Sequence, residues 1–239
     1  MKKFIYGIVV ATGALMLTGC NIFAVGKDAT NKEIVVEKDK AKQLEVEVNM
    51  GVGELTIENG SKEWVTGEAS YNDKDFEPEV TYKLKGDTAK VSIDQSKNNG
   101  IDINKGGLKN EWNLQFTNKV PMDLVVNSGA SAGMLKLSGL QLNDLEINAG
   151  VGDITVDLSG DWKKSFDVNM DMGVGVTTLI IPKDVGVKVI SEKGVGIRTI
   201  EGLISEGEGV YVNDKFDTSD VVITVHTELG VGEFEIKEE

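Results

Sequence analysis

A short glycine motif recurs along the chain and limits its fold more than any other feature. Gly-Val-Gly occurs five times, and the residues that follow it are similar in several copies. A sixth copy, Gly129-Ala130-Ser131-Ala132-Gly133, has two extra residues between its glycines. The five intact copies begin at Gly51, Gly150, Gly173, Gly194 and Gly230. A motif repeated in this way predicts one structural unit used several times.

Apolar and polar residues alternate before each motif. The residue five positions before the first glycine is aliphatic in every copy: Val46, Leu124, Leu145, Val168, Val189 and Val225. The residue two positions before it is polar in every copy: Asn49, Asn127, Asn148, Asp171, Glu192 and Glu228. The alternation resumes after the glycines, for example at Ile154 and Val156. A period of two indicates strands with one buried face, so each unit predicts strand, bend, strand.

The glycines suit the bend because glycine adopts positive φ without a Cβ clash. We expect the valine between them, such as Val151, to turn inward. Full burial of that side chain would contribute about 1.5–3 kcal/mol.

The spacing of the motifs predicts a stacked array. The first glycines of successive copies from Gly129 to Gly194 lie 21, 23 and 21 residues apart, and Gly230 follows after 36. The longer interval predicts about one extra rung of chain there. The expected fold is all-β: a solenoid-like stack of short strands with Gly-Val-Gly bends, preceded by an antiparallel β region. The predicted boundaries are a leader at 1–19, a tether and entry strand at 20–43, an N-terminal β region at 44–119 and a β-repeat domain at 120–239.

The N-terminus has the pattern of a secretory leader. Lys2 and Lys3 precede an apolar stretch from Phe4 to Met16, which is too short for a confident membrane span. Leu17-Thr18-Gly19-Cys20 then resembles the lipobox of bacterial lipoproteins, and Cys20 is the only cysteine. The resemblance implies cleavage before Cys20 and a diacylglyceryl group on its thiol. Two acyl chains anchor a protein stably, so we expect an extracytoplasmic protein held at the cell membrane.

The charge limits the classes of partner. The formal net charge is −14, and loss of Lys2 and Lys3 with the leader would lower it to −16. Such a surface repels nucleic acid and anionic lipid headgroups. Solubility explains the charge most simply, and attraction to cations or basic partners is the alternative.

The residue types that usually carry catalysis are scarce. His226 is the only histidine, and its place in the alternation predicts a solvent-facing side chain. The chain has no Gly-x-Ser-x-Gly elbow, and a zinc site would lack its usual Cys and His ligands. A dinucleotide site needs a third glycine and a following helix, whereas strands follow these glycines. We therefore predict no enzyme activity, no cofactor and no metal site.

Two sets of residues could form binding sites or could be purely structural. The polar column of Asn and acidic residues before the bends could hold calcium. Alternatively, its amides could hydrogen-bond from rung to rung, with the acidic residues facing water. We favour stacking or plain solvation over a calcium site. The tryptophans Trp64, Trp112 and Trp162 could stack on sugars or cap the core, and we favour core capping.

Short segments in a fixed order resemble the toast-rack family of bacterial surface lipoproteins. These segments are Met50-Gly51-Val52-Gly53-Glu54-Leu55, Glu77-Pro78-Glu79-Val80-Thr81-Tyr82, Asn110-Glu111-Trp112-Asn113-Leu114, Val120-Pro121-Met122-Asp123-Leu124, Leu137-Ser138-Gly139-Leu140, Ile181-Pro182-Lys183-Asp184-Val185-Gly186 and Gly230-Val231-Gly232. The resemblance implies an N-terminal β region followed by a solenoid-like β domain. That second part is similar to adhesin-like proteins and to the C-terminal half of LiaF-like proteins of the cell-wall antibiotic response.

Two functions follow as expectations. The first is a non-catalytic interaction or adhesin-like module at the cell envelope, whose partner would be an envelope protein or a wall component. The second is a regulatory component of the envelope stress response to wall-active antibiotics, which the LiaF-like resemblance suggests.

The lipid anchor can be tested with one substitution. Cys20→Ser removes the thiol that would carry the acyl chains, so the variant should leave the membrane fraction for the soluble fraction. Cell fractionation followed by immunoblotting measures the change. A variant that stays with the membrane would show that Cys20 is not the anchor.

Overall fold

The computed structural model describes residues 29–96, 107–192 and 194–239. The leader and Cys20 lie outside these ranges, so lipid anchoring stays a prediction. The described residues form one mixed 14-stranded sheet and a single 3-10 turn, η1 (Lys74–Phe76). None of their helices is long and apolar enough to cross a membrane. The all-β prediction is confirmed.

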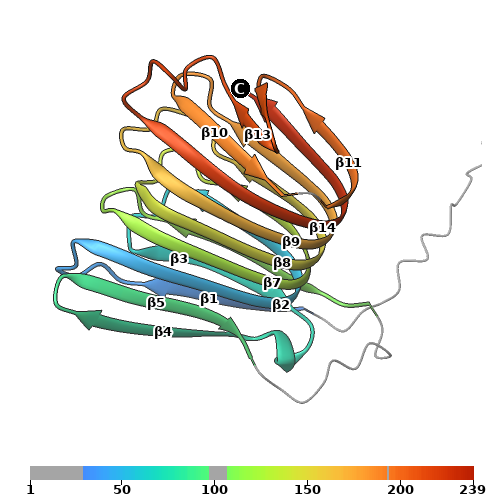
Figure 1. The fold of residues 1–239 in the computed structure, drawn as a ribbon. Helices are drawn as coiled ribbons and strands as arrows, with labels where there is room; N and C mark the ends of the chain where they lie inside the picture. The colour runs from blue at the N-terminus through green and yellow to red at the C-terminus, as the bar shows by residue number, and fades with distance from the viewer. Residues whose placement is uncertain (1–28, 97–106, 193) are drawn as a thin grey trace, which may run out of the picture.

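Five long strands form the centre of the sheet, in the order β2, β7, β8, β9 and β14. Each runs across the front of Figure 1, bends sharply and returns behind, so that it has a first and a second arm. The two strands predicted for each unit are therefore one continuous strand. The bounds are β2 (Gln43–Asn59), β7 (Met122–Lys136), β8 (Leu142–Asp157), β9 (Phe166–Ile181) and β14 (Val222–Glu238).

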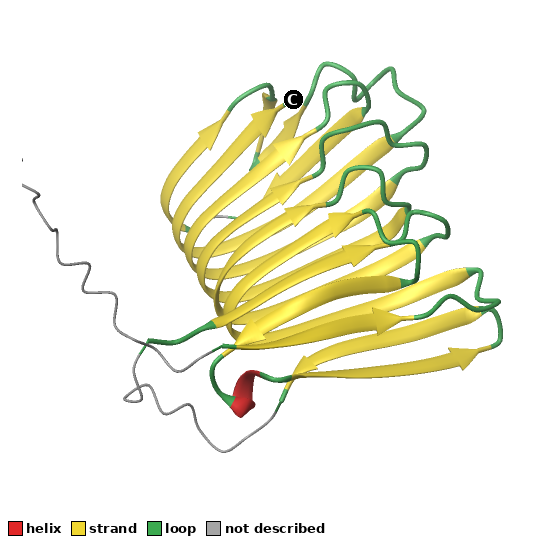
Figure 2. Ribbon diagram, turned by 180° about the vertical axis from the view of Figure 1, so that it is seen from behind, coloured by secondary structure: helices red, strands yellow, loops and turns green. Residues whose placement is uncertain are grey.

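The long strands pair in parallel and in register through the bend. Gly152 of β8 pairs with Gly175 of β9, and Gly175 pairs with Gly232 of β14. Because equivalent residues lie side by side, every position of the repeat forms a column that runs along the stack. Figure 2 shows the same stacking from behind, with the short connecting loops along one side.

The core lies between the two arms. In β8, Leu145 and Ile147 of the first arm and Ile154 and Val156 of the second arm are all buried. Most members of these columns are apolar, although Ile154 pairs with Thr177, and Thr227 continues the column of Ile147; both threonines are buried. The buried apolar residues form one cluster along the stack. Burial of a side chain of this size stabilises the fold by about 1.5–3 kcal/mol.

Four of the five motif valines face outward, which corrects the prediction that they turn inward, whereas Val52 is half-buried and packs against the core. The exposed fraction is 55% for Val151, 50% for Val174, 50% for Val231 and 70% for Val195. The chain doubles back so tightly at the glycines that a side chain on the inner side would occupy the space where the arms converge. The residue between the glycines therefore lies on the convex side.

Two rungs are split at the bend. At one end of the stack, β5 (Thr88–Gln95) pairs with the first arm of β2 and β6 (Asn110–Phe116) pairs with its second arm. At the other end, β10 (Gly186–Ser191) and β11 (Val195–Ile200) pair in the same way with the two arms of β14.

The last long strand is out of sequence order in the sheet. β14 lies between β9 and the split rung β10/β11. The extra chain between Gly194 and Gly230 includes β12 (Ile204–Gly207) and β13 (Val210–Val212), which pair antiparallel with each other, and β13 also pairs antiparallel with β10. The extra chain that the longer interval predicted is present, and it forms a small ribbon at the edge of the sheet.

Antiparallel strands cover the N-terminal end of the stack, as predicted. β1 (Thr30–Val36) pairs with β3 (Val65–Tyr71), β3 pairs with β6, and β4 (Pro78–Lys85) pairs with β5. β2 pairs with β7 along nearly its whole length, so the sheet runs without a break across residue 120. The division into domains at that residue stays a prediction.

The sixth motif is built differently from its prediction. Gly133 does not serve as the second glycine: it pairs with Leu55 and Ile154 in a core-facing column. Ser131 takes the second-glycine position opposite Gly53, and its hydroxyl forms a hydrogen bond with the Ser128 hydroxyl.

Both glycines of a motif are needed because neighbouring backbones touch at the bend. A Cβ on Gly150 would lie 2.5 Å from the carbonyl oxygen of Gly129, and a Cβ on Gly152 would lie 1.8 Å from that of Ser131. Gly152 also has φ +139°, a conformation that favours glycine. The second glycine therefore meets two constraints at once.

The bend can be tested by comparing three substitutions. Gly152→Val should lower the free energy of unfolding by more than about 2 kcal/mol, because it combines backbone strain with a collision. Gly86→Val provides the matched control, because Gly86 also has positive φ but open space around it, so it should cost only the strain of about 1–3 kcal/mol.

Thr155→Val lies on the outer face of the same strand and should change stability by less than about 0.5 kcal/mol. Urea denaturation of the three variants measures the differences. Equal midpoints for Gly152→Val and Thr155→Val would contradict the role of the bend.

Candidate functional site

The polar column beside the bend is a hydrogen-bonded ladder. Asn127 Nδ2 donates to Asn49 Oδ1 at 2.7 Å, and Asn148 Nδ2 donates to Asn127 Oδ1 at 2.8 Å. Asn49 Nδ2 extends the ladder to Asp94 Oδ1 at 2.7 Å. The predicted amide stacking is confirmed for these three rungs, and it fixes the register of the sheet beside the glycines.

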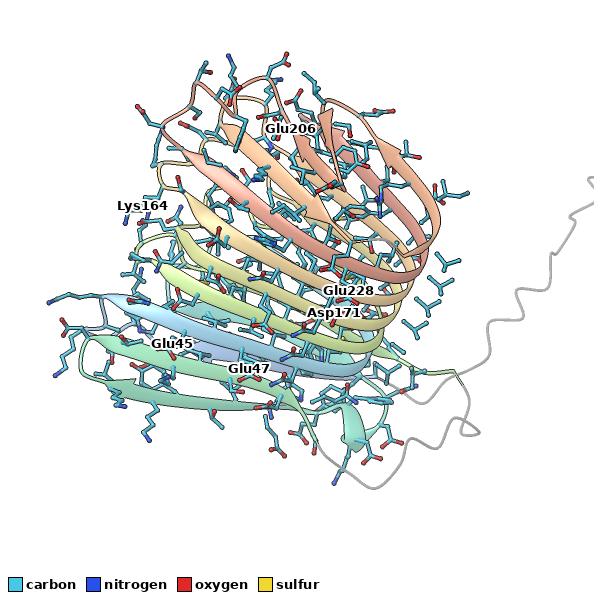
Figure 3. The ribbon with its side chains drawn as sticks, in the orientation of Figure 1. Glu45, Glu47, Lys164, Asp171, Glu206 and Glu228 are labelled. Carbon is cyan, nitrogen blue, oxygen red and sulfur yellow. The ribbon has the colours of Figure 1, made fainter. Side chains whose placement is uncertain are left out.

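The same column becomes acidic toward the C-terminal end of the stack. Asn148 pairs with Asp171, and Asp171 pairs with Glu228. Both carboxylates are exposed, and Figure 3 shows them next to each other beside the bend. Strands in a sheet lie about 4.8 Å apart, so the negative charges are close together at the solvent-exposed surface.

Two shallow grooves follow this column. The first has a volume of about 640 Å³ and is lined by Asn49, Asn127, Asn148, Asp171 and the first glycines of four rungs. The second, about 400 Å³, continues from Asn148 and Asp171 to Glu192, His226 and Glu228. Their shared residues make one polar trough along the first arms, with no Lys or Arg in its described lining.

A second acidic column lies farther from the bend on the same face. Glu45, Asp123, Asp144 and Asp167 pair in register on four adjacent strands. Burial raises the pKa of Asp144, and the charges of Asp123, Asp167 and Glu146 raise it further. This column was missed in the sequence, although an acid six residues before each of four motifs was a sufficient signal.

Tyr82, Asp39 and Trp64 form a separate hydrogen-bonded cluster at the N-terminal end of the stack, and these contacts shift the pKa values of Tyr82 and Asp39. The Tyr82 hydroxyl donates to Asp39, whose other oxygen accepts from Trp64 Nε1 at 3.2 Å. Burial and the contact with Asp39 raise the pKa of Tyr82 to about 12, and the Tyr82 hydrogen bond lowers the pKa of Asp39. These bonds tie β4 to the segment between β1 and β2.

The residues singled out for chemistry are placed apart from one another. His226 is exposed on β14, opposite Asn169 and Ile190. Trp64, Trp112 and Trp162 are all buried, with exposed fractions of 3%, 1% and 5%, so they pack in the core as predicted and present no sugar-stacking surface. Within the described ranges, no three His, Cys, Asp or Glu side chains are grouped to hold a metal ion.

The sequence matches the family model described as "N-terminal domain of toast_rack, DUF2154" over residues 25–180, which is more than half of the chain. The chain belongs to the toast-rack family. The LiaF-like part of the resemblance stays a prediction. No curated protein matches the sequence.

Solved structures of similar chains add to this assignment. A crystal structure described as "a putative cell adhesion protein" from Clostridium sporogenes is 32% identical, with a TM-score of 0.82, and the match covers 89% of this toast-rack chain and 100% of that chain. A "putative adhesin" from Bacteroides fragilis is 12% identical, with a TM-score of 0.33 over 87% of this chain and 98% of its own. The second likeness is too low to carry an argument.

The burial of Asp144 beside other carboxylates predicts that the stability of the protein depends on pH. Folding raises the pKa of Asp144, so the folded state favours the protonated form. The resulting destabilisation is absent below the unfolded pKa, grows as the pH rises, and is complete above the folded pKa.

Asp144→Asn should therefore raise the melting temperature at pH 7 and leave it unchanged near pH 3. Asp217→Asn at an exposed position makes the same change in net charge and serves as the control. Thermal unfolding followed by circular dichroism measures both. A gain at pH 7 no larger than that of the control would contradict the effect.

Proposed function

We propose that the protein is a non-catalytic, adhesin-like interaction module at the cell envelope, anchored outside the membrane by a lipid on Cys20. The observation that carries the proposal is the likeness to the Clostridium sporogenes chain, which is described as "a putative cell adhesion protein" and is matched over its full length. A shared fold at 32% identity makes a related role a direct hypothesis to test.

The architecture supports a binding role. Equivalent residues on successive rungs form columns, so similar chemical groups recur at a fixed spacing on a rigid surface. Stacked arrays commonly bind their partners along such surfaces. The trough and its acidic columns offer hydrogen-bond acceptors and negative charge over several strands. These are features suited to recognition of a partner by contact.

The lipid anchor supports display at the surface. The lipobox-like Leu17-Thr18-Gly19-Cys20 and the leader before it are the basis for this part of the proposal. Partners on this reading are the membrane, through the acyl chains, and an envelope protein or wall component through the β array. Regulation of the envelope stress response remains the alternative, and induction by wall-active antibiotics would favour it.

Adherence of intact cells tests the proposal. Cells that produce the full chain should attach several-fold more to immobilised purified cell walls, or to a layer of the same cells, than cells with the gene deleted. Cells producing Cys20→Ser should fall to the level of the deletion strain, because the chain is released. Equal adherence of the producing and deletion strains would refute the adhesive role.

A further inference from the structure

The exposed valines of the motif belong to one continuous row, which we call the bend ridge. It consists of the residues between the two glycine positions on six strands, and each pairs in register with the next. In spatial order they are Val52, Ala130, Val151, Val174, Val231 and Val195. The row runs along the stack, at right angles to the strands, on the convex side of the bend seen at the right of Figure 1.

Exposed apolar surface is concentrated at this ridge. In the described part of the chain, six of the twelve exposed large hydrophobic side chains lie at the bend of four adjacent strands: Val151, Val174, Val176, Val231, Val195 and Ile197. Val195 and Ile197 are the two most exposed of the twelve, at 70% and 65%. Contiguous exposed apolar surface marks interaction sites.

Packing does not explain why this row is apolar. Val151, Val174, Val231 and Val195 lie outside the buried core cluster. Ala130 occupies the same column in β7, so the bend forms without a branched side chain there. Neither core packing nor the bend therefore requires apolar side chains at these exposed positions, which leaves binding of a partner as an explanation.

Carboxylates flank the ridge on both sides. Along the first arms, Asp171, Glu228 and Glu192 lie beside it at the C-terminal end of the stack. Along the second arms, Glu54, Asp153 and Glu233 alternate with Ala132, Val176 and Ile197. In the described ranges neither of these two flanking columns contains a Lys or Arg. The ridge is therefore an apolar strip with carboxylates on both sides, and on the second arms Val176 and Ile197 extend its apolar surface between them.

The spacing of the strip suits a helix better than a strand. Rungs repeat about every 4.8 Å, close to the pitch of an α-helix at about 5.4 Å. An extended strand repeats side chains of one face only every 6–7 Å or so. A helix lying along the stack would place about one apolar side chain over each rung.

We propose that the bend ridge binds a basic amphipathic helix of a partner protein. The apolar stripe of that helix lies on Val151, Val174, Val231 and Val195, and its Lys or Arg side chains face the two carboxylate borders. This inference rests on the proposed interaction function and names the surface and the partner chemistry. A second copy of this chain is a poorer occupant, because its own ridge carries the same negative borders.

A synthetic peptide tests the proposal with a defined probe. The probe is a dye-labelled helix of Leu and Lys with one apolar stripe, about 18 residues long so that it can be helical. A peptide with the same composition in scrambled order lacks the stripe and keeps the charge. Fluorescence anisotropy with the purified chain measures the dissociation constant of each peptide.

Substitutions of the ridge and a matched set elsewhere identify the surface. The combined variant Val151→Thr, Val174→Thr, Val231→Thr keeps β-branched side chains and removes apolar contact, so it should weaken binding of the striped peptide about tenfold or more. The control set Val35→Thr, Val80→Thr, Ile204→Thr changes exposed positions on β1, β4 and β12 and should leave binding unchanged. Thermal unfolding checks that both sets remain folded.

The outcomes separate the inference from the function on which it rests. Equal binding of the striped and scrambled peptides, no binding of either, or equal effects of the two variant sets would overturn the ridge as a helix site. If cells still adhere through the chain in that case, the proposed function stands without this surface. If the ridge binds the peptide but gene deletion leaves adherence unchanged, the adhesive role fails and the surface remains.

Discussion

The structure depends on the close approach of neighbouring backbones at the bend. The carbonyl oxygen of Ser131 occupies the place where a Cβ of Gly152 would lie. On the next pair of strands, the carbonyl oxygen of Gly152 occupies the place where a Cβ of Gly175 would lie. The sheet can turn back on itself in register because these positions lack side chains. A bend of this kind brings the two arms together, and their inward faces then bury the core without any second sheet or helix.

The in-register pairing at the bend determines which side chains become neighbours on the outer face of the sheet. Since equivalent residues stack, a side chain that suits one rung is repeated against its own kind on the next. For asparagine this is favourable, because each amide donates to the amide before it, as in Asn49, Asn127 and Asn148. For carboxylates it is unfavourable: burial raises the pKa of Asp144, and the charges of Asp123 and Asp167 beside it in the column raise it further. Asp144 therefore costs stability when it is ionised, which is consistent with a role of its column in recognition.

The outer surface combines two features that a purely structural array would not need. One is the row of exposed valines, and the other is the negative border on either side of it. Together they give the molecule a charged and an apolar surface in a fixed geometry. Long-range attraction brings a basic partner to such a face, and apolar contact holds it there.

Much of the fold could be predicted from the sequence. The alternation around the glycines predicted the strands on either side of each bend and most of their buried positions. The family also followed from the order of short segments. The candidate site was predicted only in part: the Asn column was found, whereas the Glu45–Asp123–Asp144–Asp167 column was not.

The sequence by itself determined the repeating unit, its strand character and the composition of its inner face, because these depend on local alternation and on where glycine is tolerated. Only the tertiary structure decided that the valines face water, that Ser131 takes a glycine position, and that β14 inserts between β9 and β10/β11. Those features depend on which backbones meet across the sheet. Identical motifs at Gly173, Gly194 and Gly230 can pair in any order with the same local chemistry, so spatial order comes from the packing of the whole array.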